Sequence, residues 1–320
     1  MAHDLVFANA RVKARENNIL TRDKLLRIVE GDLNEAFSVL SEVQYDVDSG
    51  DVDTICAKEE EKLVEFMKEL DTGKPFINCL ISEYDYKTVK RAFKMKAERQ
   101  DFEFSPLSIH GFIPLDKVKS SVMSDDYDVY PESLRELLKS LDLRSVTDKL
   151  SPSFVEASID DCMYTSFLAE LDGKVGYSYY AKKVFLTNLI TLMRINRLGL
   201  DVDFFQSQYV GKKDVEYERM SGLVGESVDT IMETYRVSDY KDIVESVMSG
   251  DVDSAEAYAD DLLIRDLTAN KADMFSELLL AGYFVAKRAE IANVRLILTC
   301  IKNKVDTADV IKRLRVCYYE

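Results

Sequence analysis

The side chains of this sequence that are able to do chemistry are few and scattered. The chain has two histidines, and its five cysteines, at positions 56, 79, 162, 300 and 317, form no C-x-x-C pair. A nucleophilic thiol needs a base beside it, and His110 is able in principle to serve Cys79 or Cys162. No neighbouring residue activates either thiol, so reduced, structural thiols of a cytosolic protein are the better interpretation.

Acidic residues are abundant, but their spacing matches no metal motif. The run of aspartates between Asp46 and Asp53 suggests calcium, yet Ala57 stands where an EF-hand loop ends in glutamate. We therefore interpret this run as caps in a connection between helices. The pair Asp160–Asp161 has no specificity in so acidic a chain. The pair Asp260–Asp261 lacks the third aspartate of D-D-x-x-D, because Ile264 occupies that position, which argues against an all-helical enzyme acting on isoprenoid groups.

Nucleotide and metal motifs are missing as well. The sequence contains neither the G-x-x-x-x-G-K-[ST] phosphate loop nor the G-x-G-x-x-G fingerprint, and it has no H-E-x-x-H. Two histidines are too few for a histidine-rich metal site. We expect no catalytic residue, no bound cofactor and no metal.

The charge of the chain points to protein partners. Its 320 residues have a formal net charge of −16, and 47% of them are hydrophobic, which is ordinary for a folded protein. Binding to nucleic acid or to anionic lipid needs clustered lysine and arginine, so neither is expected. An acidic surface suits a basic protein partner, or it only keeps the protein soluble.

The elements that must position these residues are helices. All five prolines lie between residues 75 and 152, and strand patterns are sparse. The apolar stripe over residues 23–40 predicts a helix after an N-cap at Thr21, divided in two at Gly31. Ser151 with Pro152 predicts a second helix start. We expect an all-α protein.

A long internal repeat organises these helices. Residues 85–96, 185–196 and 290–298 have similar helical patterns, in which 100 residues separate Thr88 from Asn188 and 105 separate Asn188 from Asn293. The period is far longer than the roughly 20–50 residues of solenoid repeats, so it predicts three copies of a small domain. The predicted domains are 1–104, 105–212 and 213–320.

The polar residue in each repeated helix needs a partner. Asparagine is disfavoured inside a helix by roughly 0.7 kcal/mol relative to alanine, and a buried amide without partners costs more. Its partner is either a neighbouring helix terminus within the domain or another protein. Basic neighbours either bind that protein or cap helices within the domain. The candidate interface residues are Thr88, Lys90, Asn188, Arg194, Asn293 and Arg295.

The order of these motifs is familiar. Residues 7–13, 85–96, 188–189, 290–297 and 311–314 resemble the C subunit of the prokaryotic V-type and A-type ATPases, which is related to the d subunit of the eukaryotic V-ATPase. The resemblance covers the whole chain, although each motif is short. The chain departs from a uniform pattern where Thr88 replaces asparagine and where Phe185 replaces an acidic residue.

The resemblance implies a funnel of three similar helical bundles about a pseudo-threefold axis. Its partners would be the central-shaft subunits of the rotary ATPase and the membrane proteolipid ring, which it would couple for ATP-linked ion transport. The protein would be cytoplasmic, peripheral on the membrane through this complex, and would transmit torque without doing chemistry. The alternative is a helical protein-binding scaffold unrelated to a rotary motor.

Overall fold

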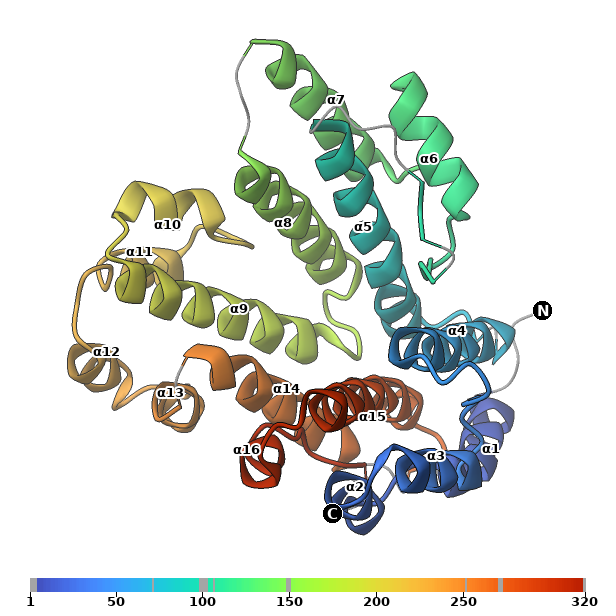
Figure 1. Ribbon diagram of the computed structural model, residues 1–320. Helices are drawn as coiled ribbons and strands as arrows, with labels where there is room; N and C mark the ends of the chain where they lie inside the picture. Colours follow the sequence, from blue (N-terminus) through green and yellow to red (C-terminus); the bar gives the residue numbers. More distant parts are fainter. Residues whose placement is uncertain are drawn as a thin grey trace. The chain divides into compact units, whose positions relative to one another are not determined.

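The described part of the chain is helical and contains no strand (Figure 1). The computed structural model describes residues 5–70, 72–97, 103–105, 107–147, 151–250, 252–269 and 273–318. The predicted all-α class is therefore confirmed.

The chain divides into two compact units, which are described separately. Unit 1 comprises Met1–Ile81, Pro106–Ile109 and Asp260–Glu320, and unit 2 comprises Ser82–Ser105 and His110–Ala259. This division does not test the three predicted domains, which stay a prediction.

Unit 1 begins with five helices in succession. They are α1 (Leu5–Arg15), the 3-10 helix η1 (Glu16–Asn18), α2 (Arg22–Glu30), α3 (Leu33–Glu42) and α4 (Val52–Leu70). The Thr21 hydroxyl accepts a hydrogen bond from the backbone N–H of Lys24, as expected for an N-cap. The break at Gly31 is also confirmed, because Asp32 begins α3 with a capping box that includes Glu35.

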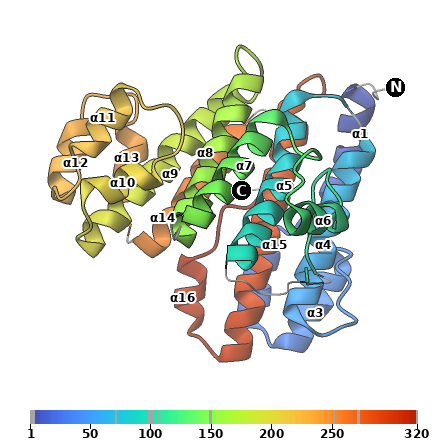
Figure 2. The ribbon, with the colours of Figure 1, turned by 90° about the horizontal axis from the view of Figure 1, so that it is seen from above.

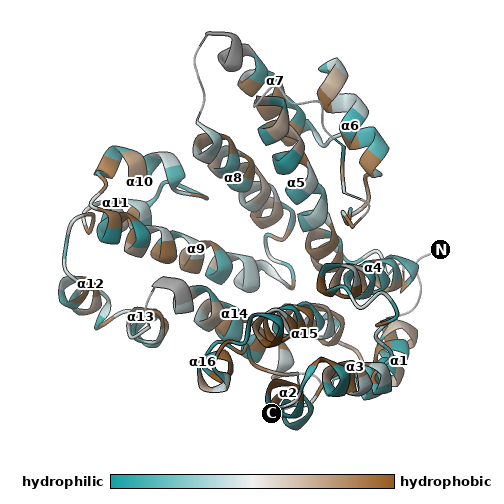
Figure 3. Cartoon of the chain, in the orientation of Figure 1, coloured by the Kyte–Doolittle hydropathy of each residue, from teal (hydrophilic) through white to brown (hydrophobic). Residues whose placement is uncertain are grey.

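The core of unit 1 is built around α15 (Glu277–Asn303), which contacts α1, α2, α3, α4 and α16 (Thr307–Lys312). More than half of its 27 residues are buried, and apolar residues lie on most of its sides (Figure 3). Gly282 lets the helix approach a neighbour, since a Cβ there would lie 3.2 Å from the carbonyl oxygen of Leu267. Figure 2 shows α16 lying beside α15. A helix from the end of the sequence thus completes a core begun at its start.

Unit 2 is built around α8 (Pro152–Glu170), which begins at the predicted Ser151 cap and makes its most extensive contacts with three other helices. Those helices are α7 (Glu132–Thr147), α9 (Tyr177–Leu198) and α10 (Val202–Gln208). The remaining helices are α6 (Leu115–Ser124), α11 (Val215–Ser221), α12 (Val228–Tyr235) and α13 (Lys241–Met248). Two further helices cross the boundary between the units in sequence, namely α5 (Pro75–Ala97) and α14 (Val252–Thr268).

The three repeat residues all lie in the interior of long helices. Thr88, Asn188 and Asn293 each lie on the second helix of a consecutive pair, and these pairs are α4–α5, α8–α9 and α14–α15. Helices α9 and α15 also end alike, at Gly199 (φ 64°) and Lys304 (φ 55°) in the left-handed conformation. An aspartate cap then begins the short helix that follows each, α10 or α16.

No helix within the described ranges is both long and apolar enough to cross a membrane.

Candidate interaction surface

The amide of Asn188 is used inside the fold. Its side chain on α9 is 1% exposed, its Nδ2 donates to the carbonyl oxygen of Val210 at 2.8 Å, and its Oδ1 accepts from the N–H of Val210 at 3.0 Å. One side chain thus satisfies both backbone groups of one residue, as a neighbouring strand would. The buried asparagine holds the segment that follows α10 against α9.

Asn293 makes the same pair of bonds in unit 1. It is 0% exposed, its Nδ2 donates to the carbonyl oxygen of Arg315 at 3.0 Å, and its Oδ1 accepts from the N–H of Arg315 at 2.8 Å. The bonded residue lies 22 positions after the asparagine in both cases. We call Val210 with Gly211, and Arg315 with Val316, the anchored segments.

A carboxylate secures the next residue of each anchored segment. Asp161 on α8 accepts from the N–H of Gly211 at 2.7 Å, and Asp261 on α14 accepts from the N–H of Val316 at 2.7 Å. Burial raises the pKa of both carboxyl groups, to about 6 for Asp261, although the bonded N–H groups oppose this rise. Each anchored segment therefore joins the two helices of its pair.

Gly211 has a geometric reason to be glycine. Its φ of +89° lies in the left-handed region, and a Cβ there would lie 2.9 Å from Cγ1 of Val184. Both the backbone conformation and the close approach to α9 favour glycine at this position.

The first copy holds its segment differently. The Thr88 hydroxyl donates to the carbonyl oxygen of Asp85 in the preceding turn, at 2.9 Å, and so makes no bond to a distant segment. The Asp85 carboxylate accepts instead from the N–H groups of Gly111, Phe112 and Ile113, at 3.0, 2.8 and 3.0 Å. Burial raises the pKa of Asp85, and the three N–H groups partly offset it.

The residues at the Asp85 position in the other copies are also buried, but they bind different groups. Phe185 stacks on Tyr240 with ring centroids 4.0 Å apart. Glu290 accepts hydrogen bonds from the N–H of Leu20 at 2.6 Å and from the Tyr45 hydroxyl at 2.8 Å. The departure at Phe185 thus changes the chemistry of a contact and leaves the position buried.

Glu290 belongs to a buried charge cluster in unit 1. The Nζ of Lys287, which is 3% exposed, lies 2.6 Å from Oε1 of Glu290 and 3.0 Å from Oε1 of Glu59. Burial alone would lower the pKa of Lys287, but the two carboxylates outweigh it and raise that pKa. Each buried charge is therefore paired, as a charge in a core must be.

The three candidate cations pair with acidic residues of the chain itself. Lys90 lies 2.6 Å from Asp160, Arg194 lies 2.5 Å from Glu256, and Arg295 pairs with Asp53. The Arg194 and Arg295 side chains are still 50% and 43% exposed, so part of each remains accessible to a partner. Thr88, Asn188 and Asn293 are buried, so any effect of the two asparagines on a partner passes through the segments that they position.

The sequence interpretation missed the carboxylates that complete these anchors. It treats Asp161 as a member of an unspecific pair and Asp261 as part of an incomplete D-D-x-x-D motif, yet each accepts a bond from an anchored segment. A signal was available, because both stand second in an Asp–Asp pair on the helix preceding an asparagine helix.

The aspartate run of residues 46–53 behaves as expected, since Asp51 accepts from the N–H of Thr54 at 2.9 Å. Across the described residues, no group of His, Cys, Asp or Glu is arranged to hold a metal.

Comparison with known proteins gives two matches. The family model described as ATP synthase (C/AC39) subunit matches residues 8–313. The chain is also similar to the C subunit of the V-type sodium ATPase of Enterococcus hirae, with 20% identity over 97% of this chain and 98% of that protein. Both matches extend over nearly the whole chain, including all three repeated helices.

Proposed function

Because this chain belongs to the ATP synthase (C/AC39) subunit family, we propose that it is a non-catalytic rotor adaptor of a V/A-type rotary ATPase. In this proposal it joins the central-shaft subunits to the membrane proteolipid ring and so couples ATP turnover to ion transport. Its three predicted domains surround an opening that receives the shaft, and α5, α9 and α15 support that opening.

One observation favours a cyclic arrangement of the predicted domains. Lys90 of the first pairs with Asp160 of the second, and Arg194 of the second pairs with Glu256 of the third. Arg295 of the third pairs with Asp53 of the first. In this proposal each predicted domain contacts the next in the same sense, and the last contacts the first. Packed helices linked in this way make a stiff body, which torque transmission requires.

A charge swap at one of these pairs tests the socket. The variants are Arg295→Glu, Asp53→Arg and the double variant with both changes. We expect Arg295→Glu to weaken binding of the central-shaft subunits, more strongly at low salt, because it places a like charge beside Asp53 and removes a cation from the socket. The melting temperature should change little, since exposed ion pairs contribute about 0–1 kcal/mol.

The double variant separates a direct contact from an internal one. It restores an ion pair within the chain but leaves position 295 acidic. If Arg295 binds the shaft, shaft affinity stays low in the double variant. Full recovery of affinity would mean that position 295 acts only through Asp53, which would contradict the socket role of this residue.

Purification from membranes tests the adaptor role as a whole. Tagged protein should bring down both the proteolipid ring and the shaft subunits, identified by native mass spectrometry. Recovery with neither would favour the alternative of an unrelated helical scaffold.

A further inference from the structure

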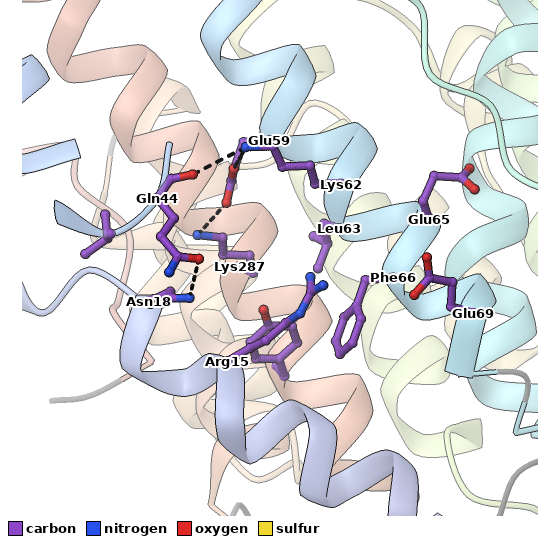
Figure 4. A pocket seen from close by; sticks show the side chains of 12 residues that line it. Arg15, Asn18, Gln44, Glu59, Lys62, Leu63, Glu65, Phe66, Glu69 and Lys287 are labelled. Carbon is purple, nitrogen blue, oxygen red and sulfur yellow. Dashed lines mark hydrogen bonds and ion pairs between the residues drawn. The ribbon is translucent and has the colours of Figure 1, made fainter. Parts of the chain in front are cut away.

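A polar cavity of about 480 Å³ opens in unit 1 between α1, α4 and α15 (Figure 4). Phe66 and Leu63 of α4 and Tyr283 of α15 form its apolar wall. Asn18 and Gln44, whose side chains bond to each other at 2.9 Å, line its polar side. The cavity thus offers an apolar surface next to amide groups.

Most charges in the cavity are already paired. Glu59 binds Lys62 at 3.3 Å and Lys287 at 3.0 Å, and Glu65 binds Lys68 at 2.8 Å. These ion pairs leave little unbalanced charge around Glu59 and Glu65.

Arg15 differs from the other cations of the cavity. Its guanidinium carbon lies 3.6 Å from the centre of the Phe66 ring, so the ring covers one face of the group (Figure 4). Within the described residues, no carboxylate lies within ion-pair distance of Arg15, and its side chain donates no hydrogen bond to the protein. A guanidinium stacked on a ring keeps its N–H edge free, and that edge fits the two oxygens of a carboxylate or phosphate.

Arg11, one turn earlier on α1, provides the contrast. Its guanidinium lies 5.2 Å from the centre of the same ring, but its Nη2 lies 3.3 Å from Oε2 of Glu69. Two arginines therefore share Phe66, and among the described residues only Arg11 of the two has an anion beside it.

We infer that this cavity binds a monocarboxylate joined to an apolar group, with the carboxylate on the Arg15 guanidinium and the apolar group against Phe66 and Tyr283. A single free cation balances one negative charge. A phosphate dianion would add a second charge beside Glu65 and Glu69, and repulsion would oppose it. This ligand site does not depend on the rotor-adaptor role, so an experiment is able to disprove one proposal and leave the other standing.

Small probes test the ligand class on the full-length protein. We expect 3-phenylpropionate to bind with a Kd of about 1 mM, measured by ligand-observed NMR titration, as suits a ligand of this size. The isosteric 3-phenylpropionamide, which has no charge, should bind at least about tenfold more weakly. Inorganic phosphate should also bind more weakly than the carboxylate.

Matched variants test the residue. Arg15→Gln should weaken 3-phenylpropionate at least about tenfold, whereas Arg11→Gln should change its affinity by less than about twofold. Arg15→Lys keeps the charge but loses the planar fork, so it should give an intermediate affinity and remains informative if Arg15→Gln folds poorly. Thermal melts of each variant control for folding.

N-acetylphenylalanine distinguishes two sources of the same chemistry. Tighter binding of this probe than of 3-phenylpropionate would indicate the carboxyl end of a polypeptide, and weaker binding would indicate a free organic acid. The inference is overturned if the amide or phosphate binds as well as the carboxylate, or if folded Arg15→Gln binds like the unmodified protein.

Discussion

The anchored segments held by α9 and α15 and the loop held by α5 lie at similar distances in sequence after their repeat residue, but opposite chemistries hold them. Asn188 and Asn293 each donate one hydrogen bond and accept another from a single backbone residue. Asp85 accepts from three consecutive N–H groups and donates none. An amide is able to match a residue with both groups free, whereas a carboxylate suits a turn whose N–H groups converge.

The comparison teaches that these three helices share an attachment and not a residue type. Thr88 bonds within its own helix, and the residue one turn before it takes over the long-range contact. The two solutions should therefore not be interchangeable, and the following variants test this, from the largest expected effect to the smallest.

Replacing the amide by a carboxylate should be the most damaging change. In Asn188→Asp or Asn293→Asp, a buried oxygen would face a backbone carbonyl oxygen, and we expect a loss of about 3 kcal/mol in the free energy of unfolding at pH 8. The pKa of the new carboxyl group would be raised in the folded state, so the loss should shrink as pH falls through that pKa. Urea unfolding at pH 8 and pH 5 measures both effects.

Asn196→Asp is the matched control. Asn196 also bonds a backbone segment, at Leu223, Gly225 and Glu226, but it is only half-buried. Water is able to solvate the new charge there, so a loss as large as that at Asn188 would contradict the role given to burial.

The opposite replacement should have an intermediate effect. Asp85→Asn turns one accepting oxygen into an N–H₂ group that faces a backbone N–H, and we expect a loss of about 2 kcal/mol, measured by urea unfolding. Asp261→Asn keeps Oδ1, which accepts the Val316 N–H, so it should not destabilise the protein at pH 8. Equal losses in the two variants would show that charge, and not the number of accepted bonds, holds these segments.

The smallest effect concerns pH. The pKa of Asp261 is about 6 in the folded protein, mainly because of burial, compared with about 3.9 when unfolded. Between these two pKa values the folded state binds more protons than the unfolded state. The free energy of unfolding should therefore fall as pH rises from 4 to 6 and stay level above pH 6. We expect a difference of about 1 kcal/mol between unmodified protein and Asp261→Asn over this range, after allowing for solvent screening. A difference that is constant with pH would contradict this assignment.

Local signals in the sequence predicted the helices well, since caps and breaks depend on a few adjacent residues. Thr21, Gly31 and Ser151 mark boundaries where they were expected. The sequence also located the two buried asparagines, because a polar residue in an apolar pattern is conspicuous. It did not reveal their partners, since Val210 and Arg315 are ordinary residues that a short returning helix brings back.

The cavity at Arg15 was beyond prediction for a related reason. Its residues come from α1, η1, the segment after α3, α4 and α15, and the two ends of this set are hundreds of residues apart. Nothing in the sequence distinguishes Arg15 from Arg11, because the difference lies in which of them Glu69 reaches. Pairing in space, and not residue type, decides which cation stays free.

The two longer stretches of sequence that make up unit 1 have the whole of α6 to α13 between them, and this order has a consequence for biosynthesis. Helices α1 to α4 leave the ribosome before α15, the helix on which their apolar faces pack. At about 5–20 residues per second, they wait on the order of 10–40 s for it. During that interval unit 2 is able to fold first. The apolar faces of α1 to α4 stay uncovered until α15 is made, so a chaperone is able to bind them.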